Sequence, residues 1–337
     1  MTGLTTRGPT VLVTGGAGYI GSHAVLALRD AGYRVVVIDN LVTGFRWAVP
    51  EDVPFVEASI DDEAVVASTI RDHDIGAIIH FAGSVVVPES VSDPLKYYLN
   101  NTVRSRSLIE CAVKGGVAHF IFSSTAATYG IPDVVPVRED MPTVPINPYG
   151  MSKLMTEAML RDTAAAHPIN YCALRYFNVA GADPKGRTGQ STAGATHLIK
   201  IAAEAATGKR ASVSVFGTDY ATPDGTGVRD YIHVSDLADA HVAALDWLIA
   251  NSGENLTANA GYGTGFSVNQ VLDAVDRVTN LKLDRRYEGR RAGDPDALVA
   301  DNTRILATLD WTPQRADLDG IVKDALAWER TLAERTS

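Results

Sequence analysis

The sequence predicts an α/β fold built on a doubly wound parallel sheet of the Rossmann type. Between residues 10 and 175, short apolar runs alternate with longer amphipathic stretches, as in repeated βαβ units. A glycine-rich turn follows the first apolar run directly. With 46% hydrophobic residues, the chain of 337 residues can also bury a full core.

The expected strands are short runs of apolar residues without the alternation of a half-exposed strand, which is typical of parallel strands covered on both faces. They are residues 11–13, 35–38, 77–79, 120–122 and 171–174. The amphipathic stretches 20–31 and 95–113 are long enough to be crossover helices between such strands.

The second half of the chain predicts a different organisation. After residue 178 the alternation weakens, and glycine and proline become frequent in 180–189 and 219–227, as in loops that build a ligand pocket. We expect a dinucleotide-binding domain over residues 1–178, to which 228–260 returns. A smaller, discontinuous α/β substrate-binding domain is expected over 179–227 and 261–337. Without a long linker, the two should share an interface and a cleft.

Composition excludes several classes of function. A net charge of -10 argues against a protein that coats nucleic acid or an anionic membrane. No run approaches 18 apolar residues and the start of the chain is polar, so we expect neither membrane spanning nor export, and a cytoplasmic location. Cys111 and Cys172 lie far apart, as thiols of a reducing compartment do, and the eight histidines show no metal-ligand spacing. No metal is expected.

The segment 14–21, Thr-Gly-Gly-Ala-Gly-Tyr-Ile-Gly, indicates a dinucleotide site. It satisfies Gly-x-Gly-x-x-Gly, and Gly15, Gly18 and Gly21 also form Gly-x-x-Gly-x-x-Gly. Missing side chains allow a tight turn and close approach of pyrophosphate to the N–H groups at the start of the following helix. Because a strand precedes the motif and a helix follows it, the motif predicts cofactor binding.

Asp39 indicates which dinucleotide binds. It closes the second expected strand, 18 residues beyond Gly21, where a carboxylate accepts hydrogen bonds from ribose hydroxyls. A carboxylate repels a 2′-phosphate, and Asn40 follows where a basic residue would be expected for NADP. The sequence therefore favours NAD.

Tyr149 and Lys153 form a candidate catalytic pair. Their four-residue spacing places a phenol beside an ammonium on one helical face. A free phenol has a pKa of about 10, and a neighbouring cation lowers this pKa, which makes the phenol a base. Alone, the pair is equally consistent with two surface residues that happen to fall four apart.

Taken in order, the glycine motif, Asp39, Phe81-Ala82-Gly83, Ser123-Ser124-Thr125 and the Tyr149/Lys153 pair resemble the extended short-chain dehydrogenase/reductase superfamily. Within it, residues 175–178, 225–234 and 290–294 resemble the UDP-glucose 4-epimerase family, over about residues 10–328. The resemblance implies reversible 4-epimerisation of UDP-glucose and UDP-galactose, through a transient 4-keto sugar and enzyme-bound NADH.

The resemblance also assigns roles to residues. Tyr149 would act as the base, aided by Thr125 and Lys153, and the two guanidinium groups in the substrate set suit a diphosphate. The implied cofactor contacts are Gly15, Gly18, Tyr19, Ile20, Gly21, Asp39, Asn40, Ile60, Phe81, Ala82, Gly83, Asn100, Ser123, Tyr149, Lys153 and Phe177. The implied UDP-hexose contacts are Thr125, Tyr149, Asn178, His197, Leu198, Phe216, Arg229, Arg291, Asp294 and Leu298.

One departure from relatives and one contrast with a rival enzyme class refine the predicted reaction and substrate. Leu298 stands where several relatives carry a tyrosine beside the hexose, and a smaller residue leaves room for the 2-acetamido group of UDP-GlcNAc or UDP-GalNAc. Ala126 and Ala127 occupy positions where a nucleotide-sugar 4,6-dehydratase needs acids, which disfavours elimination. An epimerase of UDP-pentoses or UDP-uronates stays open, as does a non-catalytic NAD-sensing protein on the same fold.

A homodimer is the expected assembly. In relatives, the helices corresponding to 95–113 and 149–166 pair across a two-fold axis as a four-helix bundle. From the sequence alone, their apolar faces fit burial in the core equally well.

Overall fold

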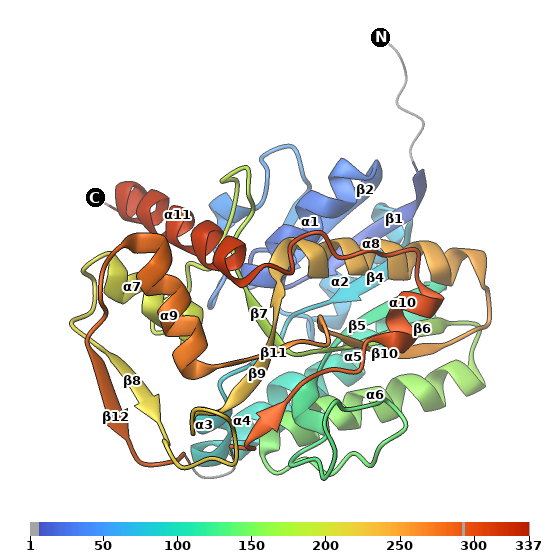
Figure 1. The fold of residues 1–337 in the computed structure, drawn as a ribbon. Coiled ribbons are helices and arrows are strands. Elements are labelled where there is room, and N and C mark those ends of the chain that lie inside the picture. Colours follow the sequence, from blue (N-terminus) through green and yellow to red (C-terminus); the bar gives the residue numbers. More distant parts are fainter. Residues whose placement is uncertain (1–6, 292–293, 337) are drawn as a thin grey trace.

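The computed structural model describes residues 7–291 and 294–336, and its centre is a parallel sheet of seven strands in the order β10-β6-β5-β4-β1-β2-β3 (Figure 1). All five predicted strands lie in this sheet, and the predicted fold class is confirmed. The strands are β1 (Arg7–Thr14), β2 (Tyr33–Asp39), β3 (Phe55–Glu57), β4 (Ile75–His80), β5 (His119–Thr125), β6 (Asn170–Tyr176) and β10 (Leu256–Ala260).

Helices cover both faces of this sheet, which explains why its strands are continuously apolar. On β1, Val11 and Val13 point into one core, and Leu12 points into the core on the opposite face. The first core is closed by α1 (Tyr19–Asp30) and α8 (Val234–Ala250). The second is closed by α2 (Glu63–Asp72), α5 (Arg104–Lys114) and α6 (Pro148–Ala166). Each fully buried aliphatic side chain contributes about 1.5–3 kcal/mol.

The helix predicted over 95–113 is interrupted. It consists of α4 (Pro94–Tyr97), the π-helical segment η2 (Tyr98–Val103) and α5 (Arg104–Lys114). The short helix α3 (Val87–Ser92) precedes it. A π-helical turn has i→i+5 hydrogen bonds and is common at functional sites. The helices predicted over 20–31 and 149–166 match α1 and α6.

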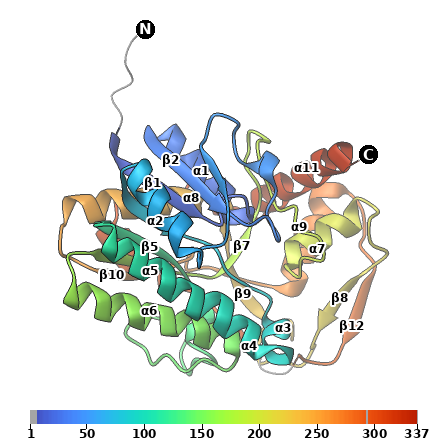
Figure 2. The same cartoon turned by 180° about the vertical axis from the view of Figure 1, so that it is seen from behind.

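The remaining elements form two smaller sheets and a separate helical layer. One sheet contains β7 (Asn178–Ala180), β9 (Val228–His233), β11 (Gly265–Ser267) and β13 (Ala297–Leu298), and the other contains β8 (Val213–Phe216) and β12 (Arg285–Glu288). The helices of this part are α7 (Leu198–Ala206), α9 (Val268–Thr279) and α11 (Leu318–Thr336), which share a core (Figure 2).

Three short helices complete the described chain: η1 (Arg46–Ala48), η3 (Ala126–Thr128) and α10 (Thr303–Thr308). Helix α8 packs on the large sheet and β10 joins it. Residues 228–260 were expected to return to the dinucleotide-binding domain, but they also include β9, which belongs to the small sheet. The division into two domains stays a prediction. Among the residues described, no helix is both long enough and apolar enough to cross a membrane.

Candidate active site

The glycine-rich turn between β1 and α1 is packed too tightly for side chains. Gly15 has φ +69°, and a Cβ there would lie 2.7 Å from the Ala82 nitrogen. A Cβ on Gly21 would lie 2.1 Å from the Gly15 carbonyl oxygen, so the first turn of α1 rests directly on the loop. Gly18 is the N-cap of α1 and adds no side chain over the helix start. This cradle fits a pyrophosphate at the N-terminus of α1.

Asp39 lies at the end of β2, beside this turn. Its Oδ2 accepts a hydrogen bond from the Ala17 N–H at 2.9 Å and its Oδ1 accepts one from the Leu41 N–H at 2.8 Å. Burial raises the pKa of this carboxyl, and the backbone donors oppose that rise. Asn40 is exposed, and its Oδ1 accepts from the Val42 N–H at 3.3 Å. The predicted ribose-binding carboxylate therefore shares one edge of the sheet with the predicted pyrophosphate cradle.

The loop after β4 joins this edge to the catalytic residues. Phe81 donates its N–H to the Thr14 carbonyl at 3.0 Å, which holds the loop against the end of β1. A Cβ on Gly83 would lie 2.9 Å from Asn101 Oδ1 and 3.6 Å from Lys153 Nζ. The predicted cofactor residues Phe81, Ala82 and Gly83 thus pass between the glycine-rich turn and Lys153.

Two successive asparagines of η2 hold the same loop. Asn101 accepts from the Ser84 N–H at 2.7 Å and donates to the Ser84 carbonyl at 2.9 Å, while Asn100 donates to Ser84 Oγ at 2.8 Å. Asn100 was predicted from the sequence to contact the cofactor, but Asn101, whose side chain is buried, was not. The available signal was a pair of asparagines inside a helical stretch, where this residue type has low helix propensity.

Lys153 is fixed in the interior at the sheet edge. Helix α6 begins where Asn147 caps it, with Oδ1 accepting from the Gly150 N–H at 2.8 Å. Lys153 is 2% exposed, and its Nζ donates to the Ser123 carbonyl at 2.9 Å. The ammonium also lies 4.9 Å from the centre of the Phe122 ring. Burial lowers the pKa of Lys153 to about 8.

Thr125 lies near enough to Tyr149 for its hydroxyl to lower the pKa of the phenol. Thr125 Oγ1 already accepts from the Ala127 N–H at 3.1 Å, so its single proton is available to the Tyr149 oxygen. The ring of Tyr97 stands edge-on to the Tyr149 ring, with centroids 6.4 Å apart. The structure therefore brings together all three residues predicted to be catalytic.

The electrostatics of Tyr149 differ from the sequence-based expectation. Burial raises its pKa, and the nearby Thr125 hydroxyl only partly opposes that rise. The groups of the chain alone thus keep the phenol protonated, although the Tyr149/Lys153 spacing predicted a lowered pKa. Further positive charge is needed beside the ring for it to act as a base, and an oxidised nicotinamide carries such a charge.

A buried ion pair, unassigned in the sequence analysis, supports α6. Glu157, one turn beyond Lys153, binds Arg175 of β6 through two contacts of 2.7 and 3.0 Å. Glu157 also accepts from the Ser124 hydroxyl, and Arg175 donates to the Tyr129 hydroxyl at 2.9 Å. Such bidentate contacts fix orientation strongly. They join α6 to β5 and β6 directly behind the catalytic residues.

The residues predicted to bind the nucleotide lie together on β8, β9 and the segment after β12. The Arg291 guanidinium carbon lies 4.7 Å from the centre of the Phe216 ring, and Arg291 Nε donates to Asp294 at 3.0 Å. Arg229 of β9 lies 3.8 Å from the same carboxylate. Ala292 and Gly293, which belong to the motif 290–294, lie outside the described residues. Two forked cations beside one aromatic ring suit a nucleoside diphosphate.

The other residues predicted to contact the substrate lie in two places. Asn178, His197 and Leu198 line a cavity of about 20 Å³, which is about the space of one water molecule. Leu298 of β13 pairs with Arg229 of β9 and is half-buried against the cluster that contains Phe177. The small sheet therefore connects the predicted hexose contacts to the predicted diphosphate contacts.

Three predicted cofactor residues have mainly structural contacts here. The Tyr19 hydroxyl donates to the Gly181 carbonyl at 2.7 Å, which ties α1 to the segment after β7. Ile20 and Ile60 pack into the two cores of the large sheet. Their cofactor contacts stay predictions, as do the other residue roles. Within residues 7–291 and 294–336, no group of three or more metal-ligating side chains occurs, and both cysteines are free thiols.

Comparison with known proteins identifies the family. The model of the NAD dependent epimerase/dehydratase family matches residues 11–260. The UDP-glucose 4-epimerase of Azospirillum brasilense is 55% identical over 99% of this chain and 96% of its own length. The chain therefore belongs to the NAD dependent epimerase/dehydratase family, and its similarity over the full length places it among the UDP-glucose 4-epimerases.

Solved structures agree with this assignment. A UDP-glucose 4-epimerase from Stenotrophomonas maltophila, with bound NAD and formylated UDP-arabinopyranose, superposes with a TM-score of 0.94 at 38% identity, covering 97% of this chain and all of that one. The UDP-Glc/GlcNAc 4-epimerase of Campylobacter jejuni gives a TM-score of 0.84 at 45% identity, covering 96% and 100%. The predicted family and the predicted NAD cofactor are confirmed.

The buried Lys153 ammonium predicts how activity depends on pH. Turnover should fall as the pH rises through about 8, because Lys153 then loses the charge that would stabilise a phenolate at Tyr149. Since the folded-state pKa lies below the ordinary 10.5, loss of this proton favours the folded protein, and this group adds stability as the pH rises between those values. Measuring kcat/KM and thermal unfolding across pH 6–10 separates the two effects. A flat profile above pH 8 would contradict the assignment.

Proposed function

We propose that the protein interconverts UDP-glucose and UDP-galactose by inverting the configuration at C4, with NAD as a resident cofactor. The observation that carries this proposal is the buried Lys153 ammonium, which lies one helical turn from Tyr149 and beside the Gly83 loop and donates to the Ser123 carbonyl of β5 at 2.9 Å. Membership of the UDP-glucose 4-epimerases supports it. When bound, NAD accepts a hydride from C4 and later returns it.

The residues of the chain handle the proton and the positioning. Tyr149 takes the proton of the 4-hydroxyl group, with Thr125 bridging the two oxygens, and the Lys153 ammonium stabilises the phenolate. Loss of the proton and the hydride leaves a 4-keto sugar. The sugar turns its opposite face to the cofactor, and return of the hydride and the proton inverts C4 with no net oxidation.

The nucleotide end holds the substrate while the sugar turns. Arg229, Arg291 and Asp294 lie on strand β9 and the segment after β12, apart from the catalytic residues on β5 and α6. Binding energy from such a remote anchor retains the intermediate without fixing the hexosyl ring. The reaction requires that the 4-keto intermediate stays bound while its hexosyl ring rotates. Separate binding of the nucleotide and the sugar permits both.

Alternative functions have less support. Ala126 and Ala127 place no acid after Thr125, so elimination of water lacks a proton donor. A non-catalytic NAD sensor would not need Thr125, Tyr149 and a buried lysine together. An epimerase of other UDP-sugars remains an alternative, since the arginine contacts would recognise the nucleotide and not the sugar.

The proposed base is tested by Tyr149→Phe. The purified variant should fold and bind NAD but convert UDP-galactose at least about 100-fold more slowly, because general-base catalysis contributes about 10²–10⁴-fold. Conversion is followed by NMR of the anomeric protons. Tyr287→Phe, at an exposed tyrosine of β12, is the control and should match the wild type. If Tyr149→Phe turns over at nearly the wild-type rate, Tyr149 is not the base. If the wild type leaves UDP-galactose unchanged, the proposed substrate is wrong.

Leu298 supports N-acetylated UDP-hexoses as second substrates. It is half-buried in a cluster with Phe177 and presents a smaller side chain than tyrosine. The related Campylobacter jejuni protein is a UDP-Glc/GlcNAc 4-epimerase. We infer that the hexose pocket accepts a 2-acetamido group.

Leu298→Tyr tests this inference. The variant should lose turnover of UDP-GalNAc by at least about tenfold and keep that of UDP-galactose within about threefold, because a clash of a few kcal/mol acts only on the larger sugar. Separate assays with the two sugars measure the ratio of kcat/KM values. No turnover of UDP-GalNAc by the wild type, or equal losses for both sugars, would contradict the inference.

We also propose that the protein is a homodimer. An apolar stripe runs along the outer surface of α4 and η2, formed by Leu95, Leu99 and Val103, which are 77%, 49% and 51% exposed. Met155 on the neighbouring α6 is 40% exposed, and α5 and α6 run side by side on that face (Figure 2). The following helix α5 packs Leu108 and Ile109 into the core, whereas the stripe on α4 and η2 is exposed. A two-fold interface would bury this stripe.

A charge on this stripe should separate the subunits. Leu95→Asp with Leu99→Asp is expected to convert a dimer of about twice the chain mass into a monomer, because an interface cannot easily bury unpaired carboxylates. Light scattering after size-exclusion chromatography measures the mass. Val42→Asp, at a valine that is 79% exposed elsewhere, is the control. A wild-type monomer, or a double variant that remains dimeric, would contradict the proposal.

A further inference from the structure

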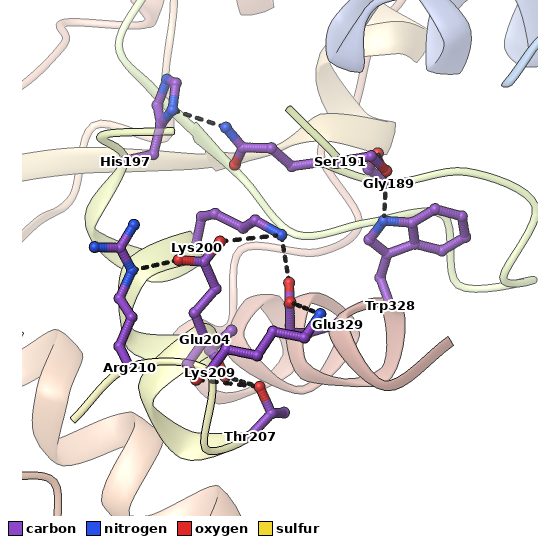
Figure 3. Close-up of polar contacts among 12 residues, drawn as sticks. Gly189, Ser191, His197, Lys200, Glu204, Thr207, Lys209, Arg210, Trp328 and Glu329 are labelled. Carbon is purple, nitrogen blue, oxygen red and sulfur yellow. Dashed lines mark hydrogen bonds and ion pairs between the residues drawn. The ribbon is translucent and has the colours of Figure 1, made fainter. Parts of the chain in front are cut away.

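A cluster of buried charged side chains lies between helix α7 and helix α11 (Figure 3). The Lys200 ammonium contacts the Glu329 carboxylate of α11 and lies 3.6 Å from Glu204. The side chains of Lys200 and Glu329 are only 5% and 1% exposed. The second oxygen of Glu329 binds Lys209 at 2.6 Å. Both charges of the Lys200–Glu329 pair are therefore removed from water, and each lies within 4 Å of two opposite charges.

The location of Lys200 lowers the net stability that this ion pair can contribute to the fold. Lys200 is the third residue of α7, and the first turn of a helix carries partial positive charge that disfavours a cation. Burial disfavours the charge further, and well-packed apolar residues often stabilise a protein as well as such a pair does. Directional contacts between two charged groups instead fix the relative position of two helices.

Helix α11 holds both ends of the segment that leads into α7. At one end, Trp328 donates its indole N–H to Ser191 Oγ at 3.2 Å, and its ring covers Gly189, where a Cβ would lie 2.3 Å from Trp328 Cγ. At the other end, Glu329 binds Lys200. The segment between these points contains His197 and Leu198, both predicted to contact the UDP-hexose substrate. Asn178, His197, Lys200 and Glu329 line the same cavity.

A second contact orients the His197 ring within this segment. The Gln190 amide nitrogen lies 2.8 Å from His197 Nδ1. An amide nitrogen is a donor, so Nδ1 is the acceptor and the ring proton is on Nε2. Burial lowers the pKa of His197, which keeps the imidazole neutral. The ring is thereby prepared as a neutral hydrogen-bond donor at the edge of the cavity.

We propose that the Lys200–Glu329 pair is a positioning element for the hexose, acting through His197 and Leu198. It anchors α7 to α11 so that these two residues keep the orientation that binds the sugar. The UDP portion is held separately, by Arg229, Arg291 and Asp294. Breaking the pair should therefore weaken binding of the sugar and leave binding of UDP unchanged. This inference rests on the proposed function.

The test compares UDP-galactose with UDP in Glu329→Gln, with Asp319→Asn as the matched control. Asp319 lies on the same helix α11 and forms an ion pair with Arg277 of α9, but both side chains are exposed. Glu329→Gln should raise the KM for UDP-galactose about tenfold, since small displacements in a site have effects of this size or larger. The Kd of UDP should stay within about twofold of the wild type, because its contacts lie on other elements. Asp319→Asn should leave both quantities unchanged.

Gln190→Leu provides a second route if Glu329→Gln does not fold. It removes only the neutral hydrogen bond to His197 and should shift the KM for UDP-galactose in the same direction without changing the Kd of UDP. A folded Glu329→Gln with the wild-type KM, or an equal loss of affinity for UDP and UDP-galactose, would overturn the proposal. Failure of the wild type to convert UDP-galactose would instead refute the proposed function, so the two failures are distinguishable.

Discussion

The burial of the Lys153 ammonium between α6 and β5 is the constraint on which the rest of the site depends. An ammonium removed from water is costly unless hydrogen-bond acceptors or aromatic rings surround it, and the Ser123 carbonyl and the Phe122 ring provide such contacts. These partners lie on a central strand of the sheet, so the charge has one allowed position. The absent side chain of Gly83 leaves space beside it. The neighbouring residues must then be arranged around a fixed charge.

Several contacts of α6 follow from this requirement. Asn147 sets where the helix begins, and Glu157 binds Arg175 of β6 through two contacts, so the helix cannot rotate or slide along the sheet. Asn101 of the π-helical segment contacts both Ser84 and Ser152, which joins the cofactor loop to α6. Lys153, Tyr149 and Thr125 therefore keep one geometry. A reaction that must run in both directions requires the same base to accept and to return a proton at a single point.

The residues predicted to bind the substrate are arranged differently, because the hexosyl group of the substrate must rotate in the site. The predicted diphosphate contacts come from β9 and the segment after β12, whereas the predicted sugar contacts come from β7, β13 and the start of α7. The first group carries permanent charges suited to strong anchoring, and the second presents neutral groups that permit reorientation. The C-terminal helix α11 supports the second group through Trp328 and Glu329. Different elements thus carry the contacts that would hold the diphosphate and those that would allow the sugar to rotate.

The sequence predicted those strands and helices whose hydrophobic pattern matches their burial in the folded protein. Five strands were recognisable because both of their faces are buried, so that they read as apolar runs. Strand β3 was missed because it is a three-residue edge strand, and β10 was missed because its sequence, Leu-Thr-Ala-Asn-Ala, has no run of large apolar residues and only one β-branched residue. The predicted catalytic residues meet because the ends of parallel strands share one edge. The Lys200–Glu329 pair joins residues 129 positions apart, and no local pattern could indicate it.

The central claim is that the fixed charge of Lys153, together with that of bound NAD, lowers the pKa of Tyr149 enough to make it a base. NMR of ¹³Cζ-labelled tyrosine measures this pKa directly in the NAD complex, with Tyr149→Phe used to assign the resonance. The account predicts that Tyr149 ionises below its ordinary pKa of about 10 in the wild-type complex, and at least about one pH unit higher in Lys153→Met. The same titration in both proteins would contradict it.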